Sequence, residues 1–210
     1  MKHAFSPVAS VCSAVLAAGL FFGAHPSVNA DTPVAATAAS SPAAMEAESR
    51  QVAQDLLKQL GGTLKAQIAA SGPESAVPVC RDVAPKLAGQ ASLAKGWKVA
   101  RVGTRTRNSL LGMPDAWEQE VLARFQQRLA AGEKLESMEF SQVVQEPAGG
   151  SSFRYMKAIG MQQQCVACHG PQDQIAPGMK AMLDQNYPHD QATGYTPGQL
   201  RGAVTIKRPI

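Results

Sequence analysis

The sequence predicts an α+β fold in which a small antiparallel sheet is flanked by helices. Three features indicate this class. Apolar residues recur every four positions between Met45 and Ala70, which is the period of a buried helix face. A second helical pattern opens at Asp115 with a clear start signal. Two strand-like runs, 138–145 and 152–159, are separated by Pro-Ala-Gly-Gly, which is typical of a hairpin turn.

Residues 1–30 have the features of a secretory signal peptide. Lys2 supplies a positive start, an apolar stretch follows, and Val28-Asn29-Ala30 forms a small-residue cleavage site. We expect cleavage after Ala30, which would leave a periplasmic or secreted chain without stable membrane insertion. An uncleaved membrane anchor is the alternative, but the apolar run is short for a bilayer span. Residues 31–45 are rich in Ala, Ser, Thr and Pro without a hydrophobic period, and they predict a flexible linker.

A single domain is expected over residues 46–210. Its first helix presents one apolar stripe, made of Val52, Leu56, Leu60, Leu64 and Ile68. Gly72-Pro73 predicts the end of this helix. A shorter helical segment follows around Cys80, in which Pro78 and Pro85 predict against a long regular helix.

The rest of the domain alternates between strands and helices. Residues 97–102 are strand-like, and the next helix opens with a capping-box spacing between Asp115 and Glu118. Gly132 stands where the end of that helix is expected. After the hairpin, short helices and loops are expected, and residues 203–207 predict a last strand.

Charge and cysteine content narrow the function. The formal net charge of +4 falls to +3 when Lys2 is removed, which is too mild and too scattered for a nucleic-acid-binding surface. Cleavage also removes Cys12 and leaves Cys80, Cys165 and Cys168. Three cysteines cannot all pair, so in an oxidising compartment one thiol needs another explanation.

Residues 165–169 read Cys-Val-Ala-Cys-His, the C-x-x-C-H spacing of c-type haem attachment. Two thiols one helical turn apart reach the two vinyl groups of one porphyrin, and the adjacent histidine binds its iron. We therefore expect Cys165 and Cys168 to form thioethers to one haem c, with His169 as the proximal iron ligand. Residues 46–210 would then be a single haem-binding domain, because one motif implies one haem.

Three other interpretations of the motif are weaker. A structural zinc site would need a fourth nitrogen or sulfur ligand, and no second ligand pair is found in the sequence. A thioredoxin-like dithiol has no use for His169. A plain disulfide between Cys165 and Cys168 would leave both His169 and Cys80 unexplained.

The second axial ligand is open on spacing alone. Cys80 is one candidate, since Arg81 beside it could favour a thiolate. Methionine is an equal candidate, because Met/His ligation is frequent in electron carriers. The methionines near the motif are Met156, Met161, Met179 and Met182. His189 lies in a polar loop and is expected to be solvated, and an inert buried cysteine is the structural alternative for Cys80.

A series of ordered landmarks extends from Glu46 to Lys207. They are Val79-Cys80 with Ala84-Pro85, Arg105-Thr106-Arg107-Asn108, Pro114-Asp115-Ala116-Trp117-Glu118, Arg154-Tyr155-Met156, the segment 165–170, Tyr187-Pro188-His189-Asp190, Ala192-Thr193-Gly194-Tyr195, Gly198 and Arg201-Gly202-Ala203. On these the chain resembles a domain-of-unknown-function family of c-type haem domains with a PAS-like fold and His/Cys axial ligation. The family includes stand-alone periplasmic cytochromes and sensor modules.

The resemblance implies a PAS-like fold and makes Cys80 the distal iron ligand opposite His169. Ser109 and Leu111 depart from the family, which tends to have proline and asparagine there, so the loop before Asp115 is expected to differ in shape. Arg101, Arg105 and Arg107 are candidates for haem propionates, although a solvated strand face is the preferred interpretation for two of the three.

An anionic thiolate stabilises Fe(III), so a low reduction potential is expected, and reduction would weaken the Fe–S bond and admit a gas. The favoured function is a periplasmic monohaem c-type cytochrome-like protein that senses redox state or a diatomic gas such as nitric oxide or carbon monoxide. It would act on a redox or signalling partner protein. A low-potential electron carrier is the alternative. A haem enzyme such as a peroxidase is less favoured, because the sequence offers no distal acid/base pair.

Overall fold

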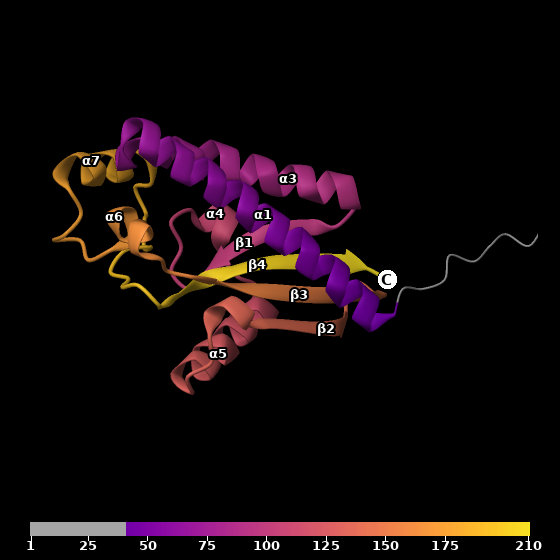
Figure 1. The fold of residues 1–210 in the computed structure, drawn as a ribbon. Coiled ribbons are helices and arrows are strands. Elements are labelled where there is room, and N and C mark those ends of the chain that lie inside the picture. The colour runs from indigo at the N-terminus through magenta and orange to yellow at the C-terminus, as the bar shows by residue number, and fades with distance from the viewer. Residues whose placement is uncertain (1–40) are drawn as a thin grey trace, which may run out of the picture. The chain divides into compact units, whose positions relative to one another are not determined.

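In the computed structural model, which describes residues 41–210, four antiparallel strands form one sheet in the order β1-β4-β3-β2 (Figure 1). The strands are β1 (Lys98–Gly103), β2 (Glu139–Gln145), β3 (Ser151–Gly160) and β4 (Leu200–Pro209). The last strand therefore lies inside the sheet, between the first strand and the hairpin. This confirms the predicted α+β class with a small antiparallel sheet.

Helices cover both faces of the sheet, and each face has its own core. Helices α1 (Pro42–Ser71) and α3 (Ala84–Lys95) pack on one face, while α5 (Ala116–Ala130) packs on the other (Figure 1). The first core includes Leu56, Val99, Phe153, Tyr155, Val204 and Ile206. The second includes Val102, Val121, Phe125, Met156 and Ala203. Alternate residues along each strand supply the two cores, as the pleat requires.

Helix α1 begins earlier than the sequence predicts. The side chain of Ser41 caps it by accepting a hydrogen bond from the backbone N–H of Ala44, and Met45 is already buried. The predicted linker is therefore wrong for residues 42–45, because the Ser41 cap and the burial of Met45 favour the helix. The helix ends at Ser71, before Gly72 with φ 81°, as predicted.

The predicted signal peptide, its cleavage after Ala30 and residues 31–40 of the predicted linker lie outside the described residues. Within the described part of the chain, no helix has both the length and the apolar character needed to span a bilayer.

The two prolines near Cys80 do not interrupt the helical path. Helix α2 (Ala76–Pro78) continues through a π-helical turn, η2 (Val79–Val83), directly into α3. The N–H of Ala84 bonds the carbonyl of Val79, five residues earlier, which closes the wider turn. Pro85 then lies in the first turn of α3, where no N–H is needed. The segment is therefore not one long regular helix, as predicted, but the π-helical turn joins α2 to α3 without ending the helical path.

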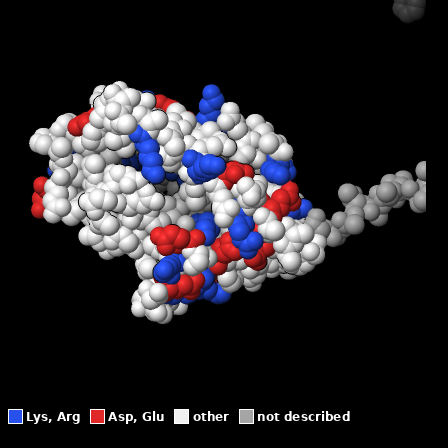
Figure 2. Space-filling view, viewed as in Figure 1, with Lys and Arg blue, Asp and Glu red and all other residues white. Residues whose placement is uncertain are grey.

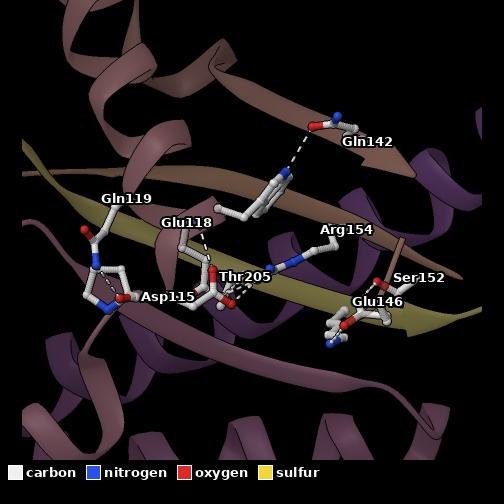
Figure 3. A network of polar contacts seen from close by, with 11 residues as sticks. Asp115, Glu118, Gln119, Gln142, Glu146, Ser152, Arg154 and Thr205 are labelled. Atoms are coloured by element: carbon white, nitrogen blue, oxygen red, sulfur yellow. Dashed lines mark hydrogen bonds and ion pairs between the residues drawn. The ribbon is translucent and has the colours of Figure 1, made fainter. Parts of the chain in front are cut away.

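Helix α5 is fixed to the sheet by a buried polar network (Figure 3). The carboxylate of Asp115 accepts from the N–H of Glu118 at 2.9 Å, and Glu118 accepts from the N–H of Asp115 at 2.8 Å, so the predicted capping box is confirmed. Glu118 is only 2% exposed, and it accepts from Arg154 on β3 at 3.0 Å and from Thr205 on β4 at 2.8 Å. The hydrogen bonds of Glu118 therefore also connect α5 to the two central strands.

The remaining elements are short. They are η1 (Pro73–Ser75), α4 (Ser109–Gly112), η3 (Leu135–Ser137), η4 (Gln163–Cys165), α6 (Val166–His169) and α7 (Pro177–Asn186). On the face shown in Figure 2, acidic and basic side chains are mixed over the α5 side, while the region of α6 and α7 is mainly uncharged.

Candidate functional site

The C-x-x-C-H segment forms a single helical turn beyond the end of β3. Cys165 closes η4, and α6 carries Cys168 and His169. Gly170 ends the turn with its N–H 2.8 Å from the carbonyl of Val166. A Cβ atom at position 170 would lie 2.6 Å from that carbonyl oxygen, so only glycine fits. All three cysteines of residues 41–210 are free thiols.

The imidazole of His169 is fixed by one hydrogen bond. Its Nδ1 lies 2.6 Å from the carbonyl oxygen of Ala192, so Nδ1 carries the proton and donates it. Burial, together with the positive charges of Arg107, Arg201 and Arg101, lowers the pKa of His169 to about 3. The ring is therefore neutral, and the Nε2 lone pair is left for a metal.

The loop that holds Ala192 is connected to the loop after β1 through a buried ion pair. Arg107 Nε lies 2.9 Å from Asp190 Oδ2, with side chains 9% and 12% exposed. Arg107 also donates through Nη2 to the carbonyl of Cys168. The other carboxylate oxygen of Asp190 accepts from the N–H of Ala192 at 2.7 Å.

Cys80 lies on the π-helical turn and within electrostatic reach of both motif cysteines. Burial raises the pKa of its thiol, while the charges of Arg101, Arg107 and Arg201 act in the opposite direction. The expectation that Arg81 favours the thiolate is wrong. Arg81 is exposed and bonds Asp82 and Asn186 instead.

Two arginines, one on each of the neighbouring strands β1 and β4, contribute positive charge near this site. Arg101 on β1 has no hydrogen-bond or ion-pair partner within residues 41–210, and burial lowers the pKa of its guanidinium. Arg201 on β4 donates to the carbonyl of Arg105 at 2.9 Å, and burial lowers its pKa as well. Both influence Cys80 or His169 electrostatically.

Of the three arginines considered as propionate partners, two are engaged with the protein. Arg105 stacks on Tyr195 with its guanidinium carbon 3.7 Å from the ring centroid, and Arg107 pairs with Asp190. Arg101 is the one whose charge is uncompensated. Arg201 is one of the landmarks of the family resemblance, but no local pattern gives it a role at the site, because its proximity to Arg101 depends on the pairing of β1 with β4.

The methionine candidates are packed into the protein. Met156, on the sheet face covered by α5, belongs to the core that contains Phe125, whereas Cys80 precedes α3 on the other face. Met161 and Met179 are 4% and 1% exposed, and the sulfur of Met179 lies 3.5 Å from that of Cys168. His189 is exposed, and Met182 is partly buried beside the Met179 cluster. Ligation by Cys80 stays a prediction.

The donor set does not suit a bare metal ion. Within residues 41–210, no three His, Cys, Asp or Glu side chains are grouped to hold one. The set does suit a porphyrin iron. It offers two free thiols on one turn, a neutral imidazole with Nε2 available, a nearby third thiol and an uncompensated cation.

Comparisons with known proteins agree with this chemistry. The model of the Tll0287-like family matches residues 28–209. A solved structure, described as the crystal structure of the cyanobacterial haem protein Tll0287, is 25% identical in sequence and superposes with a TM-score of 0.56. The match covers 81% of this chain and 97% of that one. No curated protein sequence matches the chain.

Proposed function

Because the chain belongs to the Tll0287-like family, we propose that it binds one haem c through its C-x-x-C-H segment. The observation that carries this proposal is the neutral imidazole of His169, which commits Nδ1 to Ala192 and leaves Nε2 for the iron. Cys165 and Cys168 are free thiols on the same turn. Each S–H would add across one vinyl C=C bond, giving two thioethers.

Cys80 is proposed as the distal iron ligand. Its support is its place near both motif cysteines and the positive charge of Arg101, Arg107 and Arg201, which favours the thiolate that burial disfavours. Arg101 would hold a propionate, since its guanidinium is partly buried and has no acidic partner within residues 41–210.

The site is proposed to act outside the cytoplasm, in the periplasm or as a secreted protein. Support comes from the signal-like sequence 1–30 and from the C-x-x-C-H spacing, since covalent haem attachment takes place after export.

A sensor role is favoured over simple electron transfer. A haem supplies an iron that alternates between Fe(III) and Fe(II) and that binds a diatomic gas when a coordination position is free. Cys80 lies on a π-helical turn, a feature that is frequent at functional sites and holds one residue more than an α turn. A shift of that turn toward α geometry would move Cys80 and alter the surface beside it for a redox or signalling partner.

The test begins with haem staining of the protein on a denaturing gel. We expect the stain to remain with the wild-type chain and to be lost in the double variant Cys165→Ser/Cys168→Ser, because thioethers survive denaturation. Loss of the stain from the wild type would overturn covalent attachment. Carbon monoxide or nitric oxide is then added to the reduced protein. A new absorption spectrum supports the sensor, and an unchanged spectrum would support the electron carrier instead.

A further inference from the structure

We propose that the buried ion pair between Arg107 and Asp190 positions the imidazole of His169 and thereby sets how strongly Nε2 donates to a bound iron. This inference rests on the proposed ligation of haem iron by His169. Arg107 follows β1 and Asp190 follows α7, so the pair joins two loops that are distant in sequence. Both side chains are almost excluded from solvent, at 9% and 12% exposure.

Both members of the pair bond to the residue that orients the histidine. Asp190 Oδ1 accepts from the N–H of Ala192 at 2.7 Å, and Arg107 Nη2 lies 3.5 Å from the carbonyl oxygen of Ala192. That same oxygen accepts from His169 Nδ1 at 2.6 Å. Arg107 also donates to the carbonyl of Cys168, directly before the histidine. The pair therefore restrains the backbone on both sides of the Nδ1 hydrogen bond.

Holding the two loops together does not require this pair. The N–H of Gln191 bonds the carbonyl of Thr106 at 2.8 Å, which joins the same loops through their backbones. The N–H of Tyr195 bonds the carbonyl of His169 at 2.9 Å and secures the far side. What the ion pair adds is side-chain contact with both backbone polar groups of Ala192, its N–H and its carbonyl oxygen.

The consequence for a bound iron follows from the chemistry of imidazole. A short, straight bond from Nδ1–H to a carbonyl makes the ring a stronger base and strengthens the bond from Nε2 to iron. If the carbonyl of Ala192 tilts away, the ring loses this support. The Fe–N bond should then weaken, whichever member of the pair is removed.

A change in the same direction for both variants distinguishes a positioning role of the ion pair from a purely electrostatic effect. Loss of the Arg107 cation stabilises Fe(III), whereas loss of the Asp190 anion stabilises Fe(II), so charge alone shifts the reduction potential in opposite directions. A positioning role predicts the same direction for both changes in the Fe–His stretching frequency. Arg107→Lys keeps the positive charge but loses the branched guanidinium that bonds several partners at once. This variant therefore tests the positioning effect at constant charge.

The experiment measures the Fe(II)–His stretching band by resonance Raman spectroscopy, in a Cys80→Ala parent that leaves the distal position open. We expect a lower frequency in Arg107→Gln, Arg107→Lys and Asp190→Asn than in the parent, with a more positive midpoint potential in Arg107→Lys. Bands that stay in place, or that move in opposite directions for Arg107→Gln and Asp190→Asn, would overturn the proposal.

Arg154→Gln is the matched control. Arg154 is similarly buried, at 7% exposure of its side chain, and pairs with Glu118 on α5, away from His169. It should lose stability and leave the band unmoved, which excludes a general effect of breaking a buried ion pair. If Arg107→Gln does not fold, Arg107→Lys and Asp190→Asn decide the matter. A parent without attached haem, or without an Fe–His band, would refute the proposed function rather than this inference.

Discussion

At the scale of single residues, the hydrogen bond from His169 to Ala192 decides what the site can do. With Nδ1 protonated and donating at 2.6 Å, the ring presents Nε2 as a lone pair rather than a second donor. Burial and the nearby arginine charges keep the ring neutral by lowering its pKa to about 3. A solvated histidine would be partly protonated near neutral pH and would bind a metal less readily.

Cys80→Ala tests the residue that completes the proposed coordination. If Cys80 is the distal ligand, the ferric protein should change from six-coordinate low-spin to high-spin, and its midpoint potential should rise because the thiolate no longer stabilises Fe(III). Optical and electron paramagnetic resonance spectra measure the spin state, and a redox titration measures the potential.

Met179→Leu is the control for this substitution, because Met179 is the candidate methionine whose sulfur touches Cys168. It should leave the ferric spectrum low-spin. High-spin spectra in Met179→Leu together with an unchanged Cys80→Ala would instead assign the sixth position to methionine.

At the scale of elements, the sequence allowed the strands and α5 to be predicted but not the path around Cys80. Alternation, the Pro-Ala-Gly-Gly turn and the capping box are local patterns, and each appears in the structure. The π-helical turn is not local in this sense, because the two prolines predict against a long regular helix but do not specify what replaces it. Packing of Val77, Val79 and Ala84 in the neighbouring cores favours a continuous helical path.

Asp115→Ala tests how much the capping box contributes to α5. The change removes the acceptor for the N–H of Glu118 and one of the two carboxylates that bond Arg154. We expect a loss of about 1–2 kcal/mol in the free energy of unfolding, measured by urea denaturation. Asp115→Asn keeps the cap and should recover most of this loss. If it is as unstable as Asp115→Ala, the ion pair with Arg154 and not the cap is the main contribution.

At the scale of the whole molecule, the site forms at one end of the sheet, where segments that are distant in the sequence lie close together. β1 ends at Gly103, β3 ends at Gly160 and β4 begins at Leu200, all at the same end of the sheet. The C-x-x-C-H residues could be predicted because they are contiguous. Arg101 and Arg201 meet only through strand pairing, which a single sequence does not reveal. The described fold thus places the arginines of β1 and β4 near the helical turn that carries the thiols and the imidazole of the C-x-x-C-H segment.

A polar cluster on the edge strand β2 and its neighbour β3 links α1 to the hairpin and makes stability depend on pH. Glu139 on β2 accepts from Arg50 Nε on α1 at 2.8 Å and from the hydroxyl of Tyr155 on β3 at 2.6 Å. Burial alone would raise the pKa of Glu139, but the hydrogen bonds from Arg50 and Tyr155 lower it overall. The carboxylate therefore stabilises the folded state above its unfolded pKa of about 4.3. This contribution is lost as pH falls below that value and through the folded pKa.

Glu139→Gln should consequently cost about 1–2 kcal/mol in the free energy of unfolding at pH 7 and much less at pH 3. The reason is that protonation already removes the charge of Glu139 from the wild type at low pH. Urea unfolding of the whole protein across this range measures the difference between the two curves. Glu120→Gln removes an exposed carboxylate of α5 and should leave the curve parallel to the wild type. A Glu139→Gln curve that also runs parallel would show that this cluster holds α1 by shape and not by charge, since only a charged contact disappears on protonation.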